Sequence, residues 1–159
     1  MRDHLRSQWT ILISLATVFG VVVLDRLSKI FFSDFLSIGE SFPVIRNIFH
    51  ITLVHNTGIA FGLFKDQGIV FIIIPVIAII LLIYNIYSYK NNQEFSLSYI
   101  VSFSLILGGA MGNLIDRVCF GYVIDFIDFR IWPVFNVADS AITIGAIFIF
   151  IKCIPLSVK

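Results

Sequence analysis

The sequence predicts an all-α membrane protein with four transmembrane helices and a small β-rich cradle. Of its 159 residues, 58% are hydrophobic and 13% are charged, whereas a soluble domain carries about 25% charged residues. The mean hydropathy of +0.98 agrees with this composition. Four apolar segments are each near the length of about 20 residues that a helix needs to cross a bilayer. One longer connection contains short alternating apolar runs and β-branched residues, which are typical of strands.

The four predicted spans cover residues 9–32, 69–89, 95–115 and 137–155, and we assign them to a single domain, residues 1–159. The first span follows two arginines, as a signal peptide does. Its apolar run is too long for a signal peptide, and no small-residue cleavage site follows, so we expect a retained helix. The connection at residues 40–62 predicts strands and turns, whose backbone needs partners outside the hydrocarbon.

The composition also argues against several classes of partner. The net charge is only +1 and the basic residues are not clustered, which argues against nucleic acid. Cys119 and Cys153 lack the spacing of a zinc site or a disulfide framework. His50 and His55 would point to opposite faces of a strand. We therefore predict neither a metal site nor a cofactor.

Polar residues are expected to gather on one side of the membrane. With four crossings, the end of the first span, the first connection, the end of the third span and the last connection all lie on the same side. An ionisable residue in or near the membrane is costly to bury, and it indicates a functional site. The residues concerned are Asp25, Asn56, Asn113, Asp116, Arg117, Asp125, Asp128, Asn136 and Asp139.

Several of these residues also have a structural interpretation. Asp25 precedes Lys29 by four positions, the spacing of an ion pair on a helix. Asp116 and Arg117 close the third predicted helix, where an arginine can bind the last carbonyl groups.

A third structural interpretation applies at the start of the fourth helix. Asn136 followed by Asp139 resembles an N-cap with an acid at the third helical position. Asp125 has the weakest structural explanation, because no basic residue lies within four positions of it.

We predict that Asp125 and Asp139 converge as a catalytic pair. Two carboxyl groups a few ångströms apart share one proton, because ionising both is costly. One can then accept a proton from water while the other donates to a peptide carbonyl oxygen. The N-terminus of the fourth helix favours the negative charge on Asp139.

Five blocks in the sequence carry a resemblance to a known family. They follow one another in the family's order and cover nearly the whole chain, which closely resembles the bacterial signal peptidase II (lipoprotein signal peptidase) family. The blocks are DRLSK (25–29), NTGIAFG (56–62), GGAMGNLIDRV (108–118), YVIDFIDF (122–129) and FNVADSAITIG (135–145).

The resemblance implies a membrane aspartyl endopeptidase that removes the signal peptide of prolipoproteins before a diacylglyceryl-modified cysteine. Asp125 and Asp139 match the catalytic pair. The other matched positions line or support the site: Asp25, Lys29, Asn56, Gly58, Asn113, Asp116, Arg117 and Asn136. The implied partners are the lipidated substrate and membrane lipids, with no obligate protein partner and no cofactor.

The resemblance also implies a location and an orientation. It places the chain in the bacterial cytoplasmic membrane, with both termini in the cytoplasm and the active site and cradle on the extracytoplasmic side. The distribution of basic residues does not decide this orientation.

The same resemblance suggests how the substrate sits. A signal-peptide helix lies against the apolar bundle, the acyl chains stay in lipid, and only the scissile bond approaches the dyad. Four aromatic side chains could exclude bulk water from the site, but for any single one of them plain packing at the membrane interface is the safer interpretation: Phe61, Phe64, Phe126 and Phe129.

Other functions account less well for this pattern. A transporter or channel subunit would carry polar residues through the full depth of the membrane. A scaffold protein would explain the small residues of GGAMG, but it leaves Asp125 without a role. A serine–lysine peptidase is excluded because Ser28 and Lys29 are neighbours on a helix and do not face each other.

Overall fold

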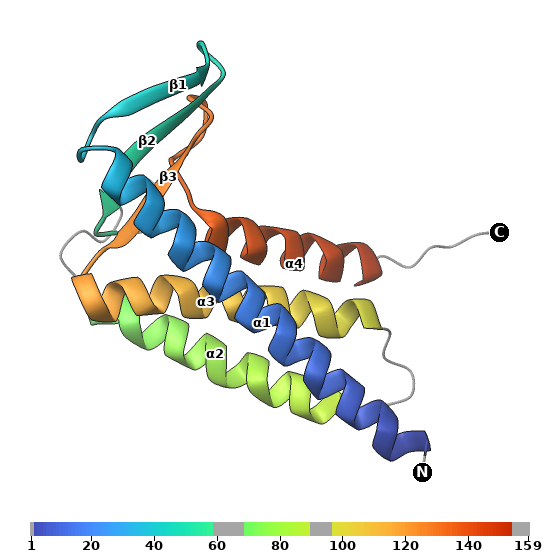
Figure 1. Cartoon of the computed structure of the whole chain (residues 1–159). Helices are drawn as coiled ribbons and strands as arrows, with labels where there is room; N and C mark the ends of the chain where they lie inside the picture. Colours follow the sequence, from blue (N-terminus) through green and yellow to red (C-terminus); the bar gives the residue numbers. More distant parts are fainter. Residues whose placement is uncertain (1, 59–68, 90–96, 154–159) are drawn as a thin grey trace.

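The computed structural model describes residues 2–58, 69–89 and 97–153. This part of the chain forms four helices and three strands (Figure 1). The helices are α1 (Arg2–Phe35), α2 (Val70–Tyr89), α3 (Leu97–Phe120) and α4 (Val137–Cys153), and the strands are β1 (Ser41–Ile45), β2 (Phe49–Asn56) and β3 (Val123–Asp128). The predicted helices are confirmed, although α3 continues five residues beyond its predicted end at Ile115. Residues 59–62 of the predicted cradle lie outside the described residues.

Two helices among the described residues are long and apolar enough to cross a membrane, Gln8–Phe35 and Leu97–Phe120. The apolar segment Ile72–Ser88 is shorter. Large apolar side chains cover the outer faces of the bundle, as Phe19 on α1 and Ile80 on α2 illustrate. A bilayer would shield these exposed surfaces from water.

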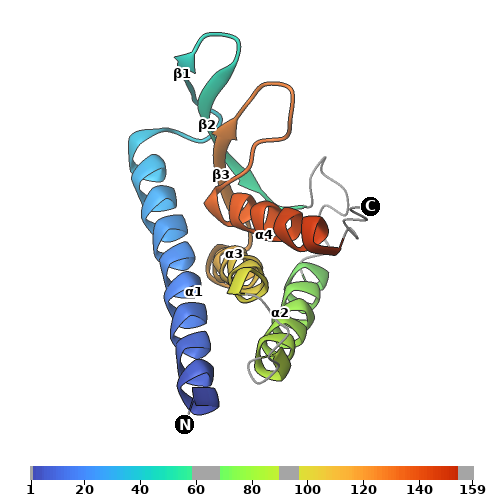
Figure 2. The same ribbon diagram turned by 90° about the vertical axis from the view of Figure 1, so that its right-hand side faces the viewer.

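Helix α3 lies at the centre and contacts each of the other three helices (Figure 2). Glycines allow the close approach that the GGAMG pattern predicts. A Cβ atom added to Gly108 would lie 2.9 Å from Cβ of Val21 on α1. At Gly109 it would collide with the backbone carbonyl oxygen of Ala138 on α4. These contacts hold α1 and α4 against the middle of α3.

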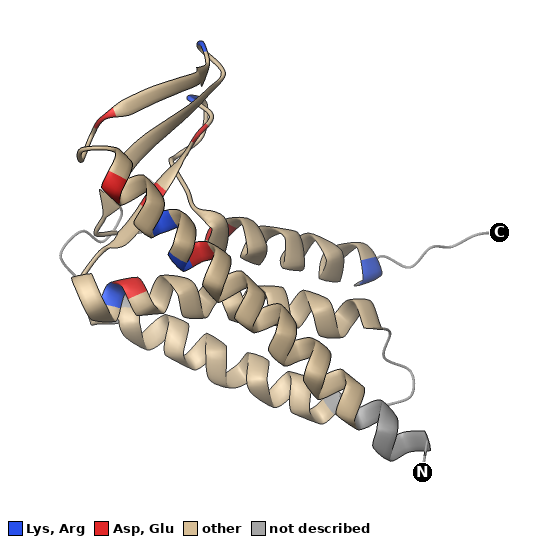
Figure 3. Ribbon diagram, viewed as in Figure 1, with Lys and Arg blue, Asp and Glu red and all other residues tan. Residues whose placement is uncertain are grey.

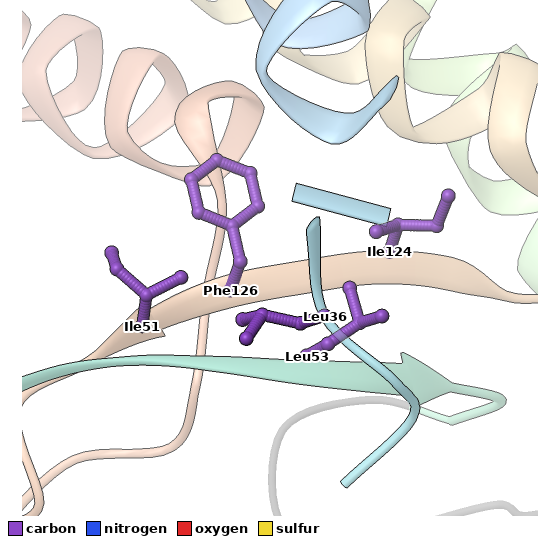
Figure 4. Close-up of a cluster of buried hydrophobic side chains, with 5 residues drawn as sticks. All are labelled: Leu36, Ile51, Leu53, Ile124 and Phe126. Atoms are coloured by element: carbon purple, nitrogen blue, oxygen red, sulfur yellow. The ribbon is translucent and has the colours of Figure 1, made fainter. Parts of the chain in front are cut away.

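The three strands form one antiparallel sheet in the order β1-β2-β3. The apolar face of the sheet holds a buried cluster at the end of α1, formed by Leu36, Ile51, Leu53, Ile124 and Phe126 (Figure 4). The other face is polar, because Asn56 and Thr52 of β2 donate hydrogen bonds to the aspartates of β3.

The prediction that the cradle forms from the first connection is incomplete, because the third strand of the sheet, β3, follows α3. The strand begins after a turn at Gly121, whose positive φ of 80° suits a glycine. Its six residues, VIDFID, include two aspartates, and aspartate is depleted in strands. Its partner β2 lies far away in the sequence.

The acidic residues whose side chains the structure describes gather toward the sheet end of the bundle (Figure 3). They come from α1, the loop before β1, α3, β3 and the first turn of α4. The sheet end of the bundle is therefore where carboxyl groups from different elements can act together.

We predict opposite effects of alanine at two helical glycines. Gly109→Ala should lower the free energy of unfolding by about 1–3 kcal/mol, because the added methyl group meets a backbone carbonyl that cannot move aside. Gly20→Ala is the matched control, since no atom lies within 4 Å of a Cβ there. It should be neutral or stabilising by up to about 1 kcal/mol. Thermal unfolding in detergent measures both, and equal effects would contradict the packing described.

Candidate active site

Asp125 and Asp139 line one cavity of about 280 Å³. Asp125 lies in the middle of β3, and Asp139 lies in the first turn of α4. Four more of the predicted site residues line the same cavity: Asn56, Gly58, Asn113 and Arg117. Residues 132–135, which were not predicted to belong to the site, close it.

Side-chain amides hold both carboxylates. Asp125 accepts hydrogen bonds from Nδ2 of Asn56 at 3.0 Å and from Nδ2 of Asn136 at 2.7 Å. Asp139 accepts one from Nδ2 of Asn113 at 2.7 Å. Each carboxylate is therefore fixed in orientation by donors from other elements.

Asn136 connects the start of α4 to this network. Its Oδ1 accepts a hydrogen bond from the backbone N–H of Asp139 at 2.9 Å, and its own N–H donates to Oδ2 of Asp139 at 3.3 Å. This reciprocal pair is the capping arrangement that the sequence predicts. Nδ2 of the fully buried Asn136 also lies 3.0 Å from Oδ1 of Asn113. Asn136 thus belongs both to the cap of α4 and to the amide groups that hold Asp125.

The two aspartates of β3 differ in their acidity. Burial, and to a smaller extent the charge of Asp139, raise the pKa of Asp125 to about 7 against the opposing effect of the amide hydrogen bonds. Burial also acts to raise the pKa of Asp128. However, hydrogen bonds from Thr52 and Arg130 outweigh it and hold that pKa below its usual value. Asp125 can therefore carry a proton near neutral pH, whereas Asp128 remains ionised.

A buried ionic cluster lies beneath the dyad and is centred on Lys29, whose side chain is 0% exposed. Nζ of Lys29 lies 2.8 Å from Oδ2 of Asp25 and 2.7 Å from Oδ2 of Asp116. It also donates to Oδ1 of Asn113 at 3.2 Å. Arg26, 22% exposed, forms an ion pair with Asp116. Two acids and two bases thus balance each other in the cluster.

The cluster positions the elements that carry the dyad. Asp25 accepts a hydrogen bond from the backbone N–H of Ala138 at the start of α4, at 3.1 Å. Asp116 accepts one from the N–H of Ile124 in β3, also at 3.1 Å. Because Oδ1 of Asn113 binds Lys29, its Nδ2 is directed toward Asp139. Helices α1 and α3 therefore set the positions of both β3 and α4.

Every predicted site residue lies in the cavity or in the network next to it. The predicted pair of Asp25 and Lys29 is confirmed. Asp116 is corrected: it lies inside α3 and pairs with Lys29 and Arg26 rather than closing the helix. Gly58 is buried, and its N–H donates to Oδ1 of Asn56 at 3.0 Å.

The two described aromatic residues of this set differ in position. Phe126 lies in the cluster on the apolar face of the sheet and not at the dyad. Phe129 lines an apolar cavity next to the dyad. Phe61 and Phe64 fall outside the described residues.

Arg26 and Trp132 are parts of the site region that the sequence did not indicate. Only a partner distant in sequence, Asp116, reveals the role of Arg26.

The described residues contain no group of three or more His, Cys, Asp or Glu side chains placed to hold a metal ion.

Comparison with known proteins defines the class. Residues 17–155 match the family model described as signal peptidase (SPase) II. The lipoprotein signal peptidase of Halothermothrix orenii is 47% identical over 126 residues, covering 79% of this chain and 84% of that one. The one from Staphylococcus haemolyticus is 37% identical over 152 residues, covering 92% and 94%.

Solved structures agree with this assignment. Two structures described as a bacterial membrane enzyme superpose with TM-scores of 0.78 and 0.79, at 36% and 37% identity. They cover 92% and 91% of this chain, and each match covers 94% of the other. The chain belongs to the signal peptidase II family, and it is a membrane protease.

We predict that Lys29 is required for stability. Lys29→Met leaves the buried carboxylates of Asp25 and Asp116 without their shared partner, which should lower the free energy of unfolding by about 3–5 kcal/mol. Adding Asp116→Asn should restore part of the loss, because it removes one of the two negative charges that Lys29 balances, while Arg26 remains to balance Asp25. Unfolding in detergent measures both variants. A Lys29→Met protein as stable as the wild type would contradict the cluster.

We predict that Asp125 makes the fold less stable as the pH rises from about 4 to about 7. The unfolded chain releases this proton near pH 4, whereas the fold holds it up to a pKa of about 7. Asp125→Asn removes this dependence of stability on pH. The free energy of unfolding of the variant, relative to that of the wild type, should therefore increase by up to about 4 kcal/mol as the pH rises from about 4 to about 7.

Asp128→Asn is the matched control, with the opposite sign. The lowered pKa of Asp128 stabilises the fold above its unfolded pKa, and this contribution is lost as the pH falls through the lowered value. The variant should be less stable than the wild type at pH 7 and approach it in acid. Unfolding curves between pH 3 and pH 8 measure both, and a constant gap for Asp125→Asn would contradict the raised pKa.

Proposed function

We propose that the chain is an aspartyl endopeptidase that removes the signal peptide from prolipoproteins, cutting before a diacylglyceryl-modified cysteine. One observation carries the proposal: the buried Asp125 and the half-buried Asp139 line one cavity, and burial raises the pKa of Asp125 to about 7. The name lipoprotein signal peptidase, borne by its relatives, supports the choice of substrate.

The two carboxyl groups take different roles in the proposed reaction. Asp139, at the N-terminus of α4 and hydrogen-bonded to Asn113, is the ionised member that accepts a proton from water. Asp125 donates its proton to the carbonyl oxygen of the scissile bond as water attacks. The proton held by Asp139 then passes to the amine nitrogen as the C–N bond breaks, and a hydroxyl group of the intermediate returns a proton to Asp125. Because the two groups are coupled, the resting proton belongs to the pair.

Other residues of the cavity serve the substrate backbone. Asn56, Gly58 and Arg117 border the space beside the dyad. An extended substrate needs partners for its N–H and C=O groups when it leaves water. A guanidinium group such as that of Arg117 can donate to a carbonyl oxygen there.

We further propose a single domain, residues 1–159, that crosses the bacterial cytoplasmic membrane four times. Helices α2 and α4 complete the four crossings with α1 and α3. Both termini then lie in the cytoplasm, and the sheet and dyad lie toward the extracytoplasmic face. This arrangement has chemical support, because the cleavage site of an exported precursor emerges on that face. Membrane lipids surround the enzyme, and the reaction needs no cofactor, metal or obligate protein partner.

The experiment that tests the function is cleavage of a purified precursor in two forms, lipidated and unlipidated, that share one peptide sequence. We expect cleavage before the cysteine of the lipidated form only. The absence of cleavage of both forms by folded protein would contradict the proposal.

We predict that the dyad variants lose turnover without losing the fold. Asp125→Asn and Asp139→Asn each remove the proton exchange, so single-turnover cleavage should fall to background, and the double variant should add little. Asp128→Asn, on the same strand, should retain cleavage. Asp116→Asn should lower stability through Lys29 but leave measurable turnover. Near-normal cleavage by Asp125→Asn would mean that the dyad is assigned to the wrong aspartate.

A further inference from the structure

A second cavity, of about 560 Å³, adjoins the dyad along α4. We call it the α4 groove. Its lining comes from α4 and from the loop after β3: Phe129, Ile131, Trp132, Phe135, Asp139, Ser140, Thr143 and Ile144. It shares Trp132, Phe135 and Asp139 with the smaller cavity. The two cavities therefore meet at the dyad.

The loop that covers the groove is held firmly at its base. Phe135 and Ile127 exchange two backbone hydrogen bonds, of 2.8 and 3.1 Å. The rings of Phe129 and Phe135 stack with centroids 5.9 Å apart. Figure 2 shows this loop leaving β3 and returning to the start of α4. The groove wall is thus a preformed part of the fold.

The two cavities differ in the chemistry they offer. The smaller one presents the amides of Asn56 and Asn113 and the guanidinium group of Arg117. In the groove, the hydroxyl of Ser140 already donates to the carbonyl oxygen of Asn136 at 2.9 Å. The remaining lining, apart from Asp139 and Thr143, is aromatic and aliphatic. A peptide backbone is better satisfied in the smaller cavity, whereas a hydrocarbon chain is better satisfied in the groove.

The rim of the groove is apolar and exposed. Ile131 and Trp132 at its rim are 93% and 64% exposed, and Ile144 at its far end is half-exposed. Tryptophan at such a position is typical of a membrane interface. A hydrocarbon chain can therefore enter sideways from the bilayer without crossing water.

We propose that the α4 groove binds the first part of an acyl chain of the substrate's diacylglyceryl group. This inference rests on the proposed function. The modified sulfur belongs to the residue whose amide nitrogen is released, so its acyl chains begin within a side chain's length of the dyad. From Asp139 to Ile144 the helix rises about 8 Å. The groove thus holds the start of the chain, and the rest lies in the bilayer. This revises the expectation that the acyl chains stay wholly in lipid.

The test compares two precursors of one peptide sequence, whose cysteine carries a glyceryl group with two hexadecanoyl or two acetyl chains. The chain packs against the groove wall in place of fluid lipid, so the wild type should show kcat/KM about 10-fold higher for the long chains than for the acetyl chains. Ile144→Trp fills the groove, and it should reduce this preference about 10-fold. Ile80→Trp, on the lipid-facing surface of α2, is the matched control and should leave the preference unchanged.

The outcomes separate the inference from the function beneath it. Ile144→Ala, which removes part of the wall without adding bulk, should reduce the preference several-fold. Equal cleavage of both precursors by the wild type would overturn the groove alone. So would an unchanged preference in the two Ile144 variants, or an equal loss in Ile80→Trp. A wild-type protein that cuts neither precursor would overturn the proposed function and the groove with it.

Discussion

The rest of the site depends on the ion pairs of the buried Lys29 ammonium group. A charge removed from water must be paired, and Lys29 pairs with Asp25 on α1 and with Asp116 on α3. These carboxylates in turn bind the backbone at the start of α4 and in β3. A buried ion pair adds little net stability over an apolar contact, but any arrangement that separates it is heavily penalised. The cluster therefore fixes the start of α4 and strand β3, which carry Asp139 and Asp125.

The same constraint explains why two aspartates of one strand differ. Asp128 meets Arg130 and the hydroxyl of Thr52, and it stays ionised. Asp125, three residues earlier, receives amide donors in a buried position, where the charged form is disfavoured. Amides stabilise a carboxylate less than a paired cation does, so its proton is retained near neutral pH. The neighbours of each carboxylate, rather than its own chemistry, assign its role.

Local patterns were readable in the sequence, and distant ones were not. The helices follow from apolar runs, the pair of Asp25 and Lys29 from helical spacing, and the cap at Asn136 from a capping pattern of four residues. The sequence did not predict strand β3, because its hydrogen-bond partners on β2 are distant in sequence: Asn56 and Asp125 are 69 positions apart. The pairing of Arg26 with Asp116, across 90 positions, escaped for the same reason. Family resemblance named the dyad, but it did not supply the neighbours that set the acidity of Asp125.

The position of the dyad at the boundary between two unlike cavities bears on how a peptide bond can be hydrolysed at a membrane surface. Water and an extended backbone need polar partners, and the sheet and the end of α3 supply them. A lipid-modified residue needs an apolar path that stays open to the bilayer, and α4 supplies that path. Asp139 belongs to both cavities because it sits in the first turn of α4, where a capped helix end meets an apolar helix face. In the proposed reaction, the start of one helix thus serves two requirements: its N-terminus stabilises the ionised carboxylate, and its next turns hold the start of the acyl chain.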